Sequence, residues 1–201
     1  MSDAFLKSVA FGIAIAAAIG PIALLIISTA ASHGLRSGCY AALGAALADL
    51  FYALLAFSAG ALILPLLATW AAGIRAGAAA TLIGFSIWLM RQAMTTGDEF
   101  PAATRPAGTL ITTFLLTLVN PVTLVIFTGF VPQLPLAGSL ATAAGLALGL
   151  FSGSLSVQLA LAVSGWLLGA GLPGPAWRRS ISIVAAAGIL VFGLIGLSSS
   201  R

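Results

Sequence analysis

The chain has 201 residues, of which 61% are hydrophobic and 6% are charged, with a formal net charge of +4. Soluble domains carry about 25% charged residues, so this composition excludes a water-exposed globular surface and predicts a multi-pass membrane protein that contacts membrane lipid. Scattered basic residues argue against nucleic-acid binding, one cysteine excludes an intramolecular disulfide, and one histidine with four acids leaves too few ligands for a metal site built by the protein alone.

Six apolar segments follow one another along the chain, each close to or above the roughly 20 residues that a membrane-spanning helix needs. They predict an all-α membrane protein with six transmembrane helices and no cofactor. The apolar run of the first segment continues past the core length of a signal peptide, so we expect it to remain as a span. The predicted spans are Phe5–Ala31, Tyr40–Leu64, Gly73–Leu89, Leu110–Val131, Ser139–Leu168 and Ile181–Leu197.

The only long polar connection, Arg91–Pro106, divides the chain in half. We expect a first three-helix repeat over residues 1–97, a central loop over 98–108 and a second three-helix repeat over 109–201. The shorter connections are expected at Ser32–Gly38, Pro65–Thr69, Pro132–Gly138 and Gly171–Arg179.

Lysine and arginine predict the orientation, because basic residues accumulate on the cytoplasmic side of a membrane. The odd-numbered connections hold more of them than the opposite side, which places the central loop in the cytoplasm and both termini in the periplasm. The two sets are Arg36, Arg91, Arg105, Arg178 and Arg179 against Lys7, Arg75 and Arg201.

The two halves resemble each other when the second is shifted by one hundred residues. Pro21 then meets Pro121, whereas Asp49 meets Gly149. Because each half has an odd number of spans, two copies must enter the membrane in opposite directions, which is the inverted-repeat arrangement of many transporters.

The paired prolines predict breaks in the first and fourth spans. Proline ends or kinks a helix, and broken helices survive in membranes where they line a protein-enclosed cavity. A helix that restarts at proline leaves backbone N–H groups free to bind an anion such as a carboxylate. The simpler alternative is that each proline only kinks its helix. The residues expected at the two breaks of a substrate site are Gly20, Pro21, Ile22 and Ala23 in the first half and Asn120, Pro121, Val122 and Thr123 in the second.

Asp49 is the third candidate, because it stands about ten residues into an otherwise uncharged span. An intramembrane acid is costly and is read as functional by default. It can carry the coupling proton or bind a substrate ammonium group. The alternative is a solvated acid, or one paired with Arg36 or Arg75. Gln158 could face the same pathway, and His33 is read as a residue of a solvated turn.

No nucleophile elbow, zinc-protease helix or phosphate-binding loop appears, so we expect neither an enzyme nor catalytic residues. Glycine spacings such as Gly34–Gly38 and Gly145–Gly149 are typical of close helix contacts. They allow a homodimer without requiring one.

With these motifs assembled, the chain resembles the LysE-type translocator family of amino-acid exporters. The resemblance rests on Gly20-Pro21, the glycine-spaced turn from Gly34 to Gly38, the run from Gly44 to Asp49, and Asn120-Pro121. It implies a secondary exporter of amino acids or related small metabolites in the bacterial inner membrane, driven by protons.

The sequence departs from the family pattern at three positions. Ile19 replaces a proline, Ala48 replaces a glycine, and Val122 stands where lysine is common. The missing lysine would be a natural partner for a substrate carboxylate, so these changes leave the substrate class open. The competing interpretations are a membrane scaffold or assembly factor that does not transport, and a metal-ion efflux protein of the same fold.

Overall fold

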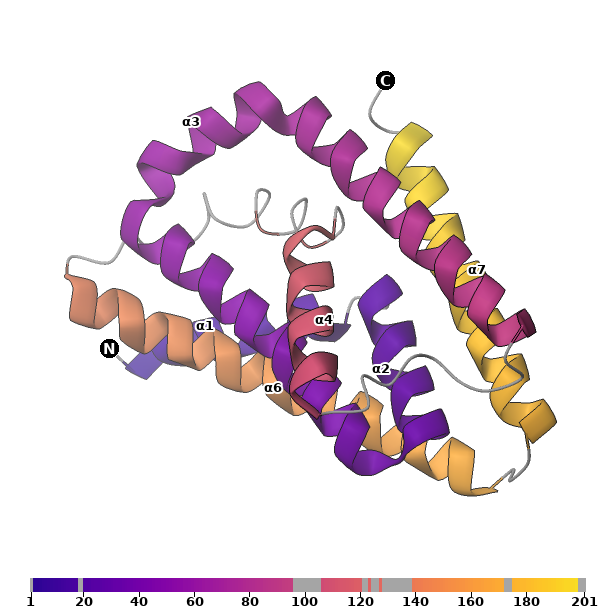
Figure 1. The fold of residues 1–201 in the computed structure, drawn as a ribbon. Coiled ribbons are helices and arrows are strands. Elements are labelled where there is room, and N and C mark those ends of the chain that lie inside the picture. The colour runs from indigo at the N-terminus through magenta and orange to yellow at the C-terminus, as the bar shows by residue number, and fades with distance from the viewer. Residues whose placement is uncertain are drawn as a thin grey trace.

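A computed structural model describes residues 2–17, 20–95, 106–120, 123, 127, 139–171 and 175–198. These residues form helices and no strand, as the sequence predicts (Figure 1). Pro121, Val122 and most of the central loop lie outside the described residues, and the paired proline breaks stay a prediction. The helices are α1 (Ser2–Ala17), α2 (Pro21–His33), α3 (Leu35–Thr95), α4 (Pro106–Leu118), α6 (Leu140–Gly171) and α7 (Pro175–Ser198).

The predicted first span consists of two helices, α1 and α2, whose axes are bent by 75°. Gly20 has an extended backbone before α2, and Pro21 occupies its first turn, where the missing proline N–H costs nothing and the fixed φ suits a helix. At the other end, Gly34 adopts a φ of 87° and donates its N–H to the carbonyl of Ala30. Glycine tolerates that left-handed conformation and therefore ends the helix.

The helix α3 covers both the second and the third predicted spans. The sequence predicts a connection at Pro65–Thr69, but the structure remains helical from Leu35 to Thr95, so that prediction is wrong. Proline removes one backbone hydrogen bond and bends a membrane helix without having to end it. Figure 1 shows α3 changing direction along its length and returning beside α7, which it contacts.

Two helical segments are long and apolar enough to cross a membrane, Leu35–Ser58 and Leu140–Gly171, and the bent pair of α1 and α2 would make a third. Three shorter apolar helices overlap the remaining predicted spans: Ala79–Trp88, Ala107–Leu118 and Arg179–Val191. The six-span inverted repeat therefore stays a prediction. The outer surface is apolar at many positions, and Trp70, Leu140 and Val184 are each at least 66% exposed. Large apolar side chains on an outer surface fit a lipid environment better than water.

The centre of the fold is α2, which contacts α3, α4, α6 and α7. Most of its residues are buried, and Ile26 and Ala30 are fully so. A helix that is apolar on every side belongs in the interior of a protein. Consequently the break before Pro21 points into the middle of the molecule, where the other helices can reach it.

Glycines allow α6 to lie directly against α1 and α2. A Cβ added to Gly153 would lie 2.1 Å from the carbonyl oxygen of Val9, and one added to Gly165 would lie 2.3 Å from that of Ile27. Small residues of this kind let membrane helices approach closely. Of the sequence-predicted spacing Gly145–Gly149, only Gly149 is in close contact, against Phe5, while Gly145 faces open space. These close glycine contacts lie within one chain, so they do not argue for a homodimer.

Candidate functional site

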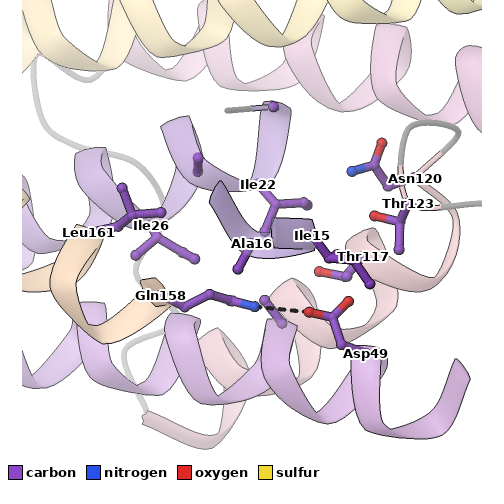
Figure 2. A pocket seen from close by; sticks show the side chains of 13 residues that line it. Ile15, Ala16, Ile22, Ile26, Asp49, Thr117, Asn120, Thr123, Gln158 and Leu161 are labelled. Carbon is purple, nitrogen blue, oxygen red and sulfur yellow. Dashed lines mark hydrogen bonds between the residues drawn. The ribbon is translucent and has the colours of Figure 1, made fainter. Parts of the chain in front are cut away.

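A cavity of about 40 Å³ lies where α1, α2, α3, α4 and α6 meet (Figure 2). A volume of about 10–15 Å³ holds one water molecule, so this cavity has room for about three. Residues from both halves of the chain line it. They are Ile15, Ala16, Gly20, Ile22, Ala23, Ile26, Ala45, Asp49, Thr117, Asn120, Thr123, Gln158 and Leu161.

Most of the predicted site residues meet at this cavity. Those that line it are Gly20, Ile22, Ala23, Asp49, Asn120 and Thr123, while Pro21 is buried at the start of α2 without being a lining residue. Pro121 and Val122 lie outside the described residues. Residues predicted at two separate breaks thus surround one space, together with the predicted intramembrane acid.

The side of the cavity formed by α2 presents hydrogen-bond donors. The first hydrogen bond of α2 runs from the N–H of Leu24 to the carbonyl of Gly20, at 3.2 Å. The N–H groups of Ile22 and Ala23 come before that first helical hydrogen bond, and the positive end of the helix dipole lies there. This end of the cavity is therefore suited to a negatively charged or acceptor group.

The opposite side presents acceptors, with Asp49 at its centre. The carboxylate is 2% exposed, so the alternative of a solvated acid is wrong. Its Oδ2 accepts a hydrogen bond from Ser154 Oγ at 2.6 Å and another from Gln158 Nε2 at 3.1 Å. Figure 2 shows the other carboxylate oxygen turned away from Gln158. Arg36 is exposed at the start of α3, thirteen residues or about 20 Å along the helix, too far to pair with Asp49.

Further polar side chains border the cavity from α4 and the segment after it. Thr117, Asn120 and Thr123 are all buried, and Figure 2 shows them along one edge of the cavity. Thr117 Oγ1 donates to the carbonyl of Thr113 at 2.8 Å, as expected for threonine in a membrane helix. Asn120 donates its N–H to the carbonyl of Thr117 at the end of α4. Together with Asp49 and Gln158, these three residues make five buried polar side chains that line one cavity.

Two residues of this site, Gln158 and Ser154, are difficult to identify from the sequence alone. Gln158 is only one of several polar residues in its span, and Ser154 is one of three serines spaced two apart. Ser152 and Ser156 instead donate to the carbonyls of Gly149 and Gly153 within α6. The signal that separates Ser154 from them is helical spacing, because residues four apart, such as Ser154 and Gln158, share a helix face.

Asp49 and Gln158 hold the same position relative to a close helix crossing. Gly44 of α3 lies against Leu110 and Phe114 of α4, and Gly153 of α6 lies against Val9 and Ile13 of α1 in the same way. Asp49 follows Gly44 by as many residues as Gln158 follows Gly153, and 109 residues separate Asp49 from Gln158. The contacts therefore match Asp49 with Gln158, and not with Gly149 as a uniform shift of one hundred would.

Tyr52 joins α3 to α4 one turn from Asp49, because its hydroxyl donates to the carbonyl of Leu118. Replacing Tyr52 with phenylalanine should lower the free energy of unfolding by about 0.5–1.5 kcal/mol, the usual worth of one hydrogen bond. The measurement is denaturant-induced unfolding of the purified protein in detergent. Tyr40→Phe is the control, since the Tyr40 hydroxyl makes no hydrogen bond to a described residue. Equal losses in the two variants would contradict this role for Tyr52.

Comparison with known proteins gives a match to a protein family. A family model described as LysE type translocator matches residues 13–200. No curated protein and no solved structure matches the chain. The matched range includes every residue that lines the cavity.

Proposed function

The chain belongs to the LysE type translocator family, and from that premise we propose that it exports amino acids or related small metabolites across the bacterial inner membrane in exchange for protons. The family makes it a membrane transporter and not an enzyme. The proposed orientation places the central loop in the cytoplasm and both termini in the periplasm, following the arginine bias.

The observation that carries this proposal is the buried carboxylate of Asp49 in a cavity bordered by both halves of the chain. A transporter of this type binds its substrate near the middle of the membrane, between two repeats. An acid at that depth can hold a proton on one side of the cycle and release it on the other. Moving one charge across the membrane is worth about 2.3 kcal/mol per 100 mV, enough to drive accumulation.

The two sides of the cavity suit a substrate with both a positive and a negative group. Asp49 would bind an ammonium group, while the first turn of α2 would bind a carboxylate. The family often has lysine at the position of Val122, and valine has no positive charge that could bind a carboxylate. The α2 N–H groups of Ile22 and Ala23 are accordingly the proposed carboxylate-binding groups.

The cavity is small compared with a pocket that binds a metabolite. Pockets that bind small molecules have volumes of about 300–1,000 Å³, whereas this one has about 40 Å³. A metabolite must therefore enter after the helices around the cavity separate. The bend between α1 and α2 is the proposed place for that movement, because no helical hydrogen bond to Ile22 or Ala23 has to break.

Transport by vesicles containing the purified protein tests the proposal. Vesicles with an acidic interior are diluted into alkaline buffer that contains radiolabelled amino acids, one at a time. We expect at least one of them to accumulate, and a protonophore to abolish the accumulation; vesicles without protein are the control. Accumulation of a divalent metal ion instead would favour metal efflux. No accumulation of any compound by correctly inserted protein would favour a scaffold, and either result would contradict the proposal.

A further inference from the structure

Asp49, Ser154 and Gln158 form a closed triangle of hydrogen bonds at the edge of the cavity. Ser154 Oγ donates to Asp49 Oδ2 at 2.6 Å, and Gln158 Nε2 donates to the same oxygen at 3.1 Å and to Ser154 Oγ at 2.7 Å. An ionised carboxylate accepts hydrogen bonds and donates none. Both hydrogen bonds to Asp49 are donated to its carboxylate, and the third runs from Gln158 to Ser154, so the arrangement fits a deprotonated acid.

The side-chain oxygen of Gln158, Oε1, takes no part in these three hydrogen bonds. Gln158 is 5% exposed and lines the cavity, and its Oε1 is buried without a hydrogen-bond partner among the described residues. Buried side-chain oxygens are nearly always paired, and an exception calls for an explanation. The amide cannot simply turn to satisfy Oε1, because it would then place an oxygen against the carboxylate oxygen of Asp49.

We propose that Ser154 and Gln158 link the protonation of Asp49 to the group that the cavity presents to a substrate, an inference that rests on the proposed proton-driven export. A proton that adds to the Asp49 carboxylate forms one O–H bond and removes its negative charge. The new O–H donates to Ser154 Oγ, and the Ser154 O–H then donates to Gln158 Oε1. Gln158 turns its amide, so that Nε2 and Oε1 exchange positions; the two hydrogen bonds of Ser154 reverse, and the direct hydrogen bond between Gln158 and Asp49 is lost.

The reversal makes proton and substrate exclude each other. With Asp49 ionised, the cavity offers a carboxylate and the Gln158 Oε1 to a group with several N–H donors, such as a primary ammonium. With Asp49 protonated, the charge is gone and a donor stands where the acceptor was. A substrate amine is then released, and the two ligands are coupled because each favours a different arrangement of the same triangle.

Within the described part of the chain, no other charged group lies at this triangle. The sequences of α4, α6 and the stretch 121–138 contain no charged or titratable side chain, α1 carries Asp3 and Lys7 at its exposed start, and α2 carries His33 at the end away from the cavity. The titratable neighbour on α3 is Tyr52, whose hydroxyl is engaged with the end of α4. The response to pH at this site is accordingly assigned to Asp49.

Infrared difference spectroscopy tests the relay with protons as the only ligand. The protein, labelled with ¹³C in its glutamine side chains, is reconstituted in lipid vesicles and compared across the pH range in which it stays folded. We expect a carboxylic C=O band that Asp49→Asn removes, and a glutamine amide band that changes at the same pH midpoint. Gln158→Met should remove the amide band, and Ser154→Ala should separate the two midpoints; Gln92→Met, near the end of α3, is the control and should change neither band.

Two results would overturn the relay: no titrating carboxyl band in the wild-type protein, or a carboxyl band that titrates without a glutamine change. Both results are measured on the wild-type protein, so neither requires that a variant folds. The outcome is also separate from that of the transport assay. Proton-driven accumulation without a glutamine change removes the relay and leaves the proposed function, whereas coupled bands without accumulation remove the proposed function and leave the link between Asp49 and Gln158.

Discussion

Replacing Asp49 with asparagine should abolish accumulation driven by a pH gradient while leaving the folded protein in the membrane. Asparagine has almost the same shape and its Oδ1 can still accept from Ser154, so the close hydrogen bond at 2.6 Å need not be lost. It cannot, however, take up a proton at physiological pH. For one-for-one exchange, a pH difference of one unit sustains about a tenfold accumulation, or about 1.4 kcal/mol. The variant should sustain none.

The control is Asp3→Asn, which removes the same charge from an exposed position at the start of α1. It should accumulate substrate like the unaltered protein, with both variants checked for equal insertion. Accumulation at the original level by Asp49→Asn would show that this acid is not the coupling group. A loss in both variants would instead attribute the effect to net charge or insertion.

Gly153→Ala should destabilise the protein, because α6 lies directly against the backbone of α1 at this residue. The new Cβ would lie 2.1 Å from the carbonyl oxygen of Val9 and 3.1 Å from the backbone nitrogen of Ile13. These backbone atoms cannot rotate aside as a side chain would. Overpacking typically costs about 1–3 kcal/mol. Because α1 also carries Ile15 and Ala16 of the cavity, transport should fall together with the thermal unfolding temperature measured in detergent.

Gly145→Ala is the matched control on the same helix, since a Cβ there meets no atom within 4 Å. Alanine is a better helix former than glycine by about 1 kcal/mol in a helix interior. This variant should unfold at the same or a slightly higher temperature. If both alanine variants lost equal stability, the close crossing of α1 and α6 at Gly153 would not be what holds these helices together.

Local backbone chemistry is the part of the fold that the sequence predicts well. Pro21 stands in the first turn of α2, and Gly20 before it is extended, because the allowed conformations of these two residues decide the matter within a few positions. Pro65 shows the limit of the same reasoning. Proline inside an apolar run fits a connection or a bent helix equally well, so the local sequence does not decide between them.

The cavity is predictable wherever its residues stand out chemically. Asp49 is the lone acid of its segment, and Asn120 adjoins a proline, so both are visible in the sequence alone. Gln158 is not, because one hundred residues separate the two prolines while 109 separate Asp49 from Gln158. A single shift cannot align both pairs. Which of the 23 glycines lie at helix crossings likewise depends on neighbours that are distant in the sequence.

The size of the cavity also bears on how the membrane keeps its voltage. Three waters in a row extend over about 8 Å, against a hydrocarbon core of about 30 Å. Apolar side chains such as Ile15, Ile26 and Leu161 stand beside them. A file of three waters would therefore cover only about a quarter of that thickness, too little by itself to conduct protons across the membrane.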